Sequence, residues 1–215
     1  MKRKIRNIIA GTLCGLASLF PMKANAQING NLEAIKSFEP GQSYFRPNIF
    51  YDLPLGIKGY TFGEFYQDGE NYFIKTNLTR NIHKNLNVKA QVICGSNLTD
   101  KIGVGLDAVI PMPEKTFARG YFIPAFIDTK AKKIDNRSII GYFVSADLPL
   151  GFKALSFGEI NVAGKNGAEW TYGEIGLEKE ILKNFSVSYN PALKNNGNGK
   201  VIPRLEHRAT AKYTF

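Results

Sequence analysis

The chain has 215 residues, of which 44% are hydrophobic and 12% aromatic, and it carries 28 Lys and Arg against 18 Asp and Glu. This basic excess is modest, so no nucleic-acid partner is predicted. The chain has only two cysteines, Cys14 and Cys94, which excludes a disulfide framework, so stability must come from a large core or from a membrane.

The first 26 residues have the pattern of a secretory signal peptide. A cationic start is followed by an apolar stretch from Ile8 to Phe20, which is shorter than the ~20 residues that a membrane-spanning helix needs. Ala24 and Ala26 form a small-residue cleavage site, so residues 1–26 are predicted to be removed and residues 27–215 to form one domain. No later stretch has the length and hydrophobicity of a spanning helix, so any membrane span in this domain must consist of strands.

The rest of the chain alternates with the period of two that is typical of strands. In residues 102–110, for example, Ile102, Val104 and Leu106 share one face while Gly103 and Asp107 share the other. No sustained helical stripe follows the signal. Twelve strands are expected, at approximately 28–36, 43–53, 57–66, 70–80, 85–94, 101–111, 116–127, 137–148, 152–163, 168–178, 184–192 and 201–215.

Two halves of about 95 residues resemble one another. The run Asp-Leu-Pro-Leu-Gly occurs at residues 52–56 and again at residues 147–151, and Phe-Gly-Glu recurs in the same register at residues 62–64 and 157–159. We therefore expect an internal duplication of a six-stranded unit. Tight, proline-bearing turns alternate with longer polar loops such as 128–137 and 194–200, which is the asymmetry between the two rims of an outer-membrane barrel.

These features together resemble a bacterial outer-membrane β-barrel: a signal peptide, amphipathic strands of about ten residues, and a last strand that ends on Phe215. The resemblance covers the mature chain as an architecture, and no particular family is identified. It implies an all-β fold, a closed antiparallel transmembrane β-barrel of about twelve strands in the lipid of the outer membrane. It also implies that the terminal aromatic residues, Tyr213 and Phe215, are read by the barrel-insertion machinery.

Strand parity divides the side chains into a lipid face and a lumen face. A Lys or Arg at mid-membrane on the lipid face costs ~2–4 kcal/mol, so charged side chains are assigned to the lumen. Strand 116–127 is apolar on both faces, and Arg119 is placed in the lumen with the others. The predicted pore-lining residues are Arg46, Lys75, Lys89, Asp107, Arg119, Glu174, Arg208 and Lys212.

The favoured function is a small, porin-like passive channel for polar solutes. A barrel of twelve strands is intermediate between small barrels that side chains fill and large barrels with a water channel. The sequence is therefore compatible with a narrow pore and also with a lumen that is closed by salt-bridged side chains. The main alternative is therefore a closed barrel with a structural or surface-binding role through its extracellular loops. A soluble, secreted β-sandwich, which would bury the apolar face, ranks below both.

An enzyme in the barrel wall ranks lowest, and the protein is predicted not to be an enzyme. His207 shares the lipid parity of the last strand, but the nearby Ser186 and Ser188 have inward parity, so a catalytic dyad is not favoured. Two distant histidines and one remaining cysteine offer no metal-ligand spacing, and no phosphate-binding glycine loop is found. Neither a metal nor a cofactor is predicted.

Overall fold

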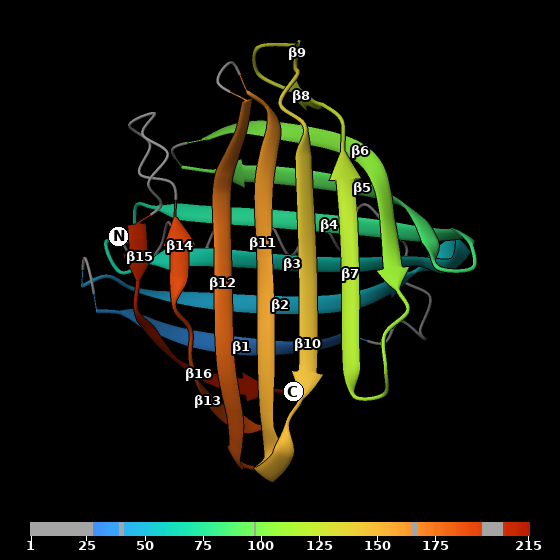
Figure 1. Ribbon diagram of the computed structural model, residues 1–215. Helices are drawn as coiled ribbons and strands as arrows, with labels where there is room; N and C mark the ends of the chain where they lie inside the picture. The colour runs from blue at the N-terminus through green and yellow to red at the C-terminus, as the bar shows by residue number, and fades with distance from the viewer. Residues whose placement is uncertain (1–27, 39–40, 97, 165–166, 195–203) are drawn as a thin grey trace.

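The structure is a computed structural model that describes residues 28–38, 41–96, 98–164, 167–194 and 204–215. Within these ranges the regular elements are strands and two short 3-10 turns (Figure 1). No helix among the described residues is long and apolar enough to cross a membrane. The predicted signal peptide, residues 1–26, and most of the predicted loop 194–200 lie outside the described residues.

The strands follow one another along the chain as antiparallel neighbours. The first half contains β1 (Ile28–Ser37), β2 (Ser43–Leu53), β3 (Ile57–Tyr66), β4 (Tyr72–His83), β5 (Leu86–Gly95) and β6 (Leu98–Ile110). The second half contains β7 (Thr116–Ile123), β8 (Phe126–Asp128), β9 (Lys133–Asp135), β10 (Ile139–Asp147), β11 (Phe152–Gly164), β12 (Gly167–Leu182), β13 (Phe185–Tyr189), β14 (Ala192–Lys194), β15 (Arg204–Glu206) and β16 (Arg208–Thr214).

The sheet closes on itself, because β1 pairs with β16 and β11 pairs with β12. Two wall strands are interrupted next to a proline: Pro124 separates β7 from β8, and Pro191 separates β13 from β14. Proline has no backbone N–H for the ladder, which explains both breaks. A third break, at His207, separates β15 from β16. With these segments joined, the wall is a closed antiparallel barrel of 12 strands, which confirms the predicted fold class.

The strands are strongly tilted around the barrel. In Figure 1 the front strands, β7 and β10–β12, cross steeply over β1–β5 of the back wall. Closing a sheet into a barrel requires such a tilt, and it brings strands that are far apart in the sequence to the same height of the lumen. Contacts across the lumen are therefore possible between residues that no local pattern relates.

The apolar face of the sheet lies outside. On β6, the side chains of Ile102, Val104 and Leu106 are 41%, 57% and 48% exposed, while Asp107, on the opposite face of the same strand, is 1% exposed. Such a surface would be unfavourable in water, but it matches the outward apolar band of a barrel in a bilayer. The alternative of a soluble sandwich is therefore wrong, because it required these side chains in a dry core.

The repeated Asp-Leu-Pro-Leu-Gly run forms the same turn twice. One copy is η1 (Pro54–Gly56) between β2 and β3, and the other is η2 (Pro149–Gly151) between β10 and β11. In each turn the leucine has a positive φ, 65° for Leu55 and 60° for Leu150. The glycine after it also has a positive φ, a conformation that glycine adopts without steric cost. The repeat thus has a structural meaning at both turns, while duplication of the whole six-stranded unit stays a prediction.

Candidate functional site

A cavity of about 1300 Å³ occupies the interior of the barrel. Its lining includes Asp52 and Lys58 beside the η1 turn and Asp68 and Asn71 in the loop at the opposite rim. One continuous cavity therefore reaches both rims of the barrel, and it is the candidate site.

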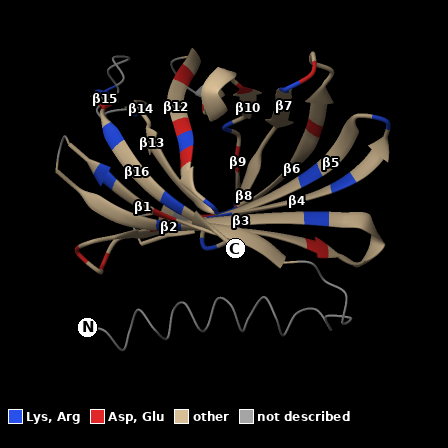
Figure 2. Cartoon of the chain, turned by 90° about the horizontal axis from the view of Figure 1, so that it is seen from below, with Lys and Arg blue, Asp and Glu red and all other residues tan. Residues whose placement is uncertain are grey.

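The lining is charged, but it is balanced in sign. Among the described residues, nine Lys or Arg side chains and nine Asp or Glu side chains line the cavity. Figure 2 shows the Lys and Arg positions of the barrel as short blue bands, and the Asp and Glu positions as short red bands, along strands that are mostly uncharged. Because the numbers are equal, the local pairing of the charges decides what a passing solute meets.

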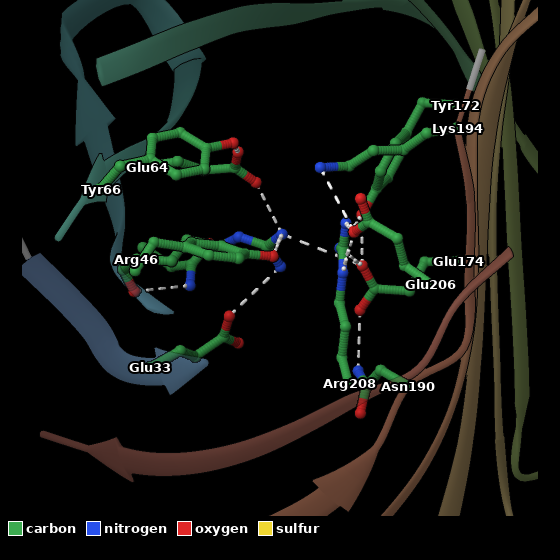
Figure 3. Close-up of polar contacts among 12 residues, drawn as sticks. Glu33, Arg46, Glu64, Tyr66, Tyr172, Glu174, Asn190, Lys194, Glu206 and Arg208 are labelled. Atoms are coloured by element: carbon green, nitrogen blue, oxygen red, sulfur yellow. Dashed lines mark hydrogen bonds and ion pairs between the residues drawn. The ribbon is translucent and has the colours of Figure 1, made fainter. Parts of the chain in front are cut away.

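The largest polar cluster is centred on Arg46 of β2. Its guanidinium lies 2.7 Å from Glu64 on β3 and 3.4 Å from Glu33 on β1. It also lies 3.8 Å from Glu174 on β12, and Figure 3 shows this contact joining two groups of side chains that come from different parts of the wall. Three wall strands separate β2 from β12 around the barrel, so Arg46 reaches into the lumen rather than along the sheet.

Arg208 completes this cluster from the other side. Its guanidinium lies 3.0 Å from Glu174 and 2.7 Å from Glu206, and it donates a hydrogen bond to the hydroxyl of Tyr172 at 2.7 Å. Lys194 is 3.4 Å from Glu206 (Figure 3). An unpaired buried charge would be strongly destabilising. In this cluster each carboxylate has a cationic neighbour, so the buried charges are compensated.

A second contact crosses the lumen between Lys75 and Glu159. Lys75 lies on β4 and Glu159 on β11, with four wall strands between them on the shorter way around. Tyr121 of β7 donates a hydrogen bond to the same carboxylate, and the ammonium of Lys89 lies 3.5 Å from the centroid of the Tyr121 ring. This chain of contacts crosses the lumen and narrows it between β4 and β11.

Arg119 and Asp107 form a pair along the wall. The Arg119 Nε is 2.6 Å from Asp107 Oδ2, and Asn87 donates to the other carboxylate oxygen at 2.9 Å. Arg119 remains one-third exposed although Asp107 is buried. Although β7 is apolar on both faces, its Arg119 side chain lines the lumen, which is the face that strand parity predicts for it.

The predicted pore-lining residues all belong to the inward parity of their strands. Seven of them line the cavity: Arg46, Lys75, Lys89, Asp107, Arg119, Glu174 and Lys212. The eighth, Arg208, is 1% exposed and lies behind the cavity surface in the Arg46 cluster. Whether these residues meet a conducted solute stays a prediction.

The outer surface carries the other residues that the sequence singled out. Tyr213 and Phe215 are 50% and 53% exposed at the rim of the short turns. His207 contacts the Tyr189 hydroxyl through its Nδ1, and the two rings stack with centroids 6.0 Å apart. Ser188 lines the cavity instead, so the partner of His207 is a tyrosine and not the serine of a dyad.

Aromatic residues of the lumen were missed by the sequence reasoning. Phe50, Tyr60, Phe62 and Phe73 line the cavity on β2, β3 and β4. The signal was available, because Phe50 shares the parity of Arg46, and Tyr60 and Phe62 share the parity of Glu64. Aromatic residues are common on the lipid face of a barrel and in its girdles, so their chemical type alone does not point to the lumen.

No protein-family model matches the chain, and no curated protein matches it. Solved structures do match its fold. One described as KdgM porin has a TM-score of 0.57 at 8% identity, with 87% of this chain and 99% of that chain covered. A second, described as KdgM porin in complex with disordered oligogalacturonate, also has a TM-score of 0.57, at 9% identity, and covers the same shares.

A third structure, described as NanC porin, has a TM-score of 0.57 at 6% identity and covers 86% of this chain and 100% of that chain. At these identities the likeness concerns the fold alone. The chain therefore has the closed twelve-strand fold found in bacterial outer-membrane porins.

Proposed function

We propose that the protein is an outer-membrane channel that lets small polar solutes pass without an energy source. The observation that carries this proposal is the continuous cavity that reaches both rims inside a barrel with an apolar outer face. A barrel with this arrangement offers a polar path across a bilayer. The shared fold with the KdgM and NanC porins supports the same function.

The route to the membrane belongs to the same proposal. Residues 1–26 would direct export and be cleaved, and the exposed terminal aromatics, Tyr213 and Phe215, would be read by the insertion machinery. We propose no catalytic role for His207, whose Nδ1 contacts the Tyr189 hydroxyl among the described residues.

A closed barrel with a surface-binding role is the second candidate. The contact between Lys75 and Glu159 favours it, because that pair narrows the lumen. The β8–β9 hairpin also stands above the rim of the long loops (Figure 1). It is fixed by the carboxylate of Asp135, which lies 2.6 Å from the ammonium of Lys101 and 2.6 Å from the guanidinium of Arg137. A loop held in this way would present a defined surface.

Planar-bilayer recording of the refolded mature protein separates the two candidates. Discrete current steps in KCl support the channel. A protein that is folded, as shown by heat-modifiable migration in gels, and that gives no steps over many insertions supports the closed barrel instead.

A further inference from the structure

A row of aromatic side chains, here called the aromatic track, lies on the inner surface of the barrel wall along β2, β3 and β4. It consists of Phe50, Tyr60, Phe62 and Phe73, whose consecutive ring centroids are 4.8, 5.8 and 5.7 Å apart. Phe50 lies three residues before the end of β2 at the short-turn rim, while Phe73 is the second residue of β4 at the opposite rim. The aromatic track therefore runs over most of the height of the lumen.

The wall opposite the start of the track is also aromatic. Phe143 on β10 lies against Phe117 on β7, with ring centroids 6.0 Å apart. Five wall strands separate β10 from β2 in either direction, so these rings and Phe50 lie on opposite sides of the barrel. All three are more than a third exposed: Phe50 by 45%, Phe117 by 42% and Phe143 by 36%. A solute at this end of the lumen passes between two aromatic surfaces.

The charged side chains of the lumen do not indicate a preference for one sign of solute charge. The nine basic and nine acidic side chains of the lining are balanced. Many of them are already paired, as Arg46 is with Glu64 and Lys75 with Glu159. A charged solute that binds at one of these paired groups would compete with the ion pair already present, which disfavours charge as the main basis of recognition there.

Uncharged hydrogen-bonding groups accompany the track instead. The Asn48 amide accepts a hydrogen bond from the Tyr60 hydroxyl at 2.8 Å and donates one to Asn31 at 2.8 Å. Asn77, two residues beyond Lys75 on the inward face of β4, also lines the cavity. Apolar surface beside a few neutral polar groups suits a solute that has apolar C–H surfaces and hydroxyl edges.

We propose that the aromatic track is a binding path for uncharged oligosaccharides. Sugar rings carry C–H groups that pack on aromatic side chains, and their hydroxyls bond to carboxamides and to charged groups that stay paired. This assignment rests on the proposed channel function and names its solute class.

The test uses the refolded mature protein in a planar bilayer, with maltohexaose as the uncharged probe and oligogalacturonate as the charged probe. Potassium chloride currents are recorded first, and their absence contradicts the channel function itself. With currents present, maltohexaose is expected to interrupt them in a concentration-dependent way and at lower concentration than oligogalacturonate. No interruption by maltohexaose, or stronger interruption by oligogalacturonate, overturns the solute assignment and leaves the channel intact.

Substitutions test whether the sugar binds at the aromatic track. Phe62→Ala is expected to weaken interruption by maltohexaose about threefold to tenfold, and Phe62→Tyr to restore it. The matched control is Phe45→Ala, on the outward face of β2 and 42% exposed, which should leave the interruption unchanged. Heat-modifiable migration verifies that each variant is folded. Equal interruption in a folded Phe62→Ala protein, or equal weakening in Phe45→Ala, contradicts the proposal.

Discussion

Neutralising the two partners of the Lys75–Glu159 contact one at a time is expected to change ion selectivity in opposite directions. The side chains are 8% and 18% exposed and lie in the narrowed part of the lumen. Lys75→Gln leaves an extra negative charge there, and Glu159→Gln leaves an extra positive charge. The first variant should favour cations and the second anions, while the double variant should return to the selectivity of the unmodified channel.

The size of the effect follows from Coulomb's law. One unit charge roughly 10 Å from a passing ion contributes about 0.4 kcal/mol in water, so cation and anion differ by about 0.8 kcal/mol. Screening reduces this to roughly a threefold change in the permeability ratio in ~0.01 M salt, and to under about twofold in ~0.1 M salt. The contact is also a bridge across the lumen, so all three variants should conduct more current than the unmodified channel.

The assay is the reversal potential across a bilayer with a tenfold KCl gradient, at two mean salt concentrations. Heat-modifiable migration shows that each variant is folded. Shifts of the same sign in both single variants would refute the reasoning, as would a shift that persists undiminished at high salt. A double variant that differs from the unmodified channel as much as either single variant would also refute it.

Further predictions concern stability and the loops. Arg46→Ala leaves carboxylates on three strands without their shared cation and should destabilise the barrel by about 3–5 kcal/mol, seen as a lower urea midpoint of heat-modifiable migration. Val104→Arg, at the middle of the outward face of β6, should lower the free energy of unfolding in lipid by ~2–4 kcal/mol, whereas Ile110→Arg at the strand end should lower it by about 0–1 kcal/mol. Refolding titrations measure both values, and equal losses would argue against a bilayer around β6. The Arg137 guanidinium holds the pKa of the Asp135 carboxyl below its ordinary value, so the stability from this contact is present above the usual aspartate range and is lost only as the pH falls through the lowered pKa. Hydrogen exchange of the β8–β9 hairpin, corrected for intrinsic rates, should thus be unchanged between pH 5 and pH 8, and a loss of protection near pH 5 would contradict this.

Strand parity predicted much of the fold and of the lumen. Charges cannot face hydrocarbon, so the side on which Lys75, Lys89 and Arg119 lie follows from alternation alone. The wall strands lie close to the expected ranges for the same reason. The breaks next to Pro124 and Pro191 fall within or at the end of expected strands, although a proline inside a strand is itself a signal for such a break.

The cross-lumen contacts could not be predicted in the same way. Lys75 meets Glu159 and Arg46 meets Glu174 only because of the tilt and stagger of the closed barrel, which no local pattern encodes. The aromatic track was missed for a different physical reason. A lumen, unlike lipid, accepts both polar and apolar side chains, so hydrophobicity does not identify its face, and the parity of Tyr60 and Phe62 with Glu64 was the better guide.

Accessibility of single cysteines during current recording tests the central claim most directly. In a Cys94→Ser background, Asn77→Cys places a thiol on the inward face and Val104→Cys places one on the outward face. A charged, water-soluble thiol reagent is predicted to reduce the current through the Asn77→Cys channel and to leave the Val104→Cys channel unchanged. Modification that lowers the current at the outward position and spares the inward one would contradict a polar path inside a lipid-facing barrel.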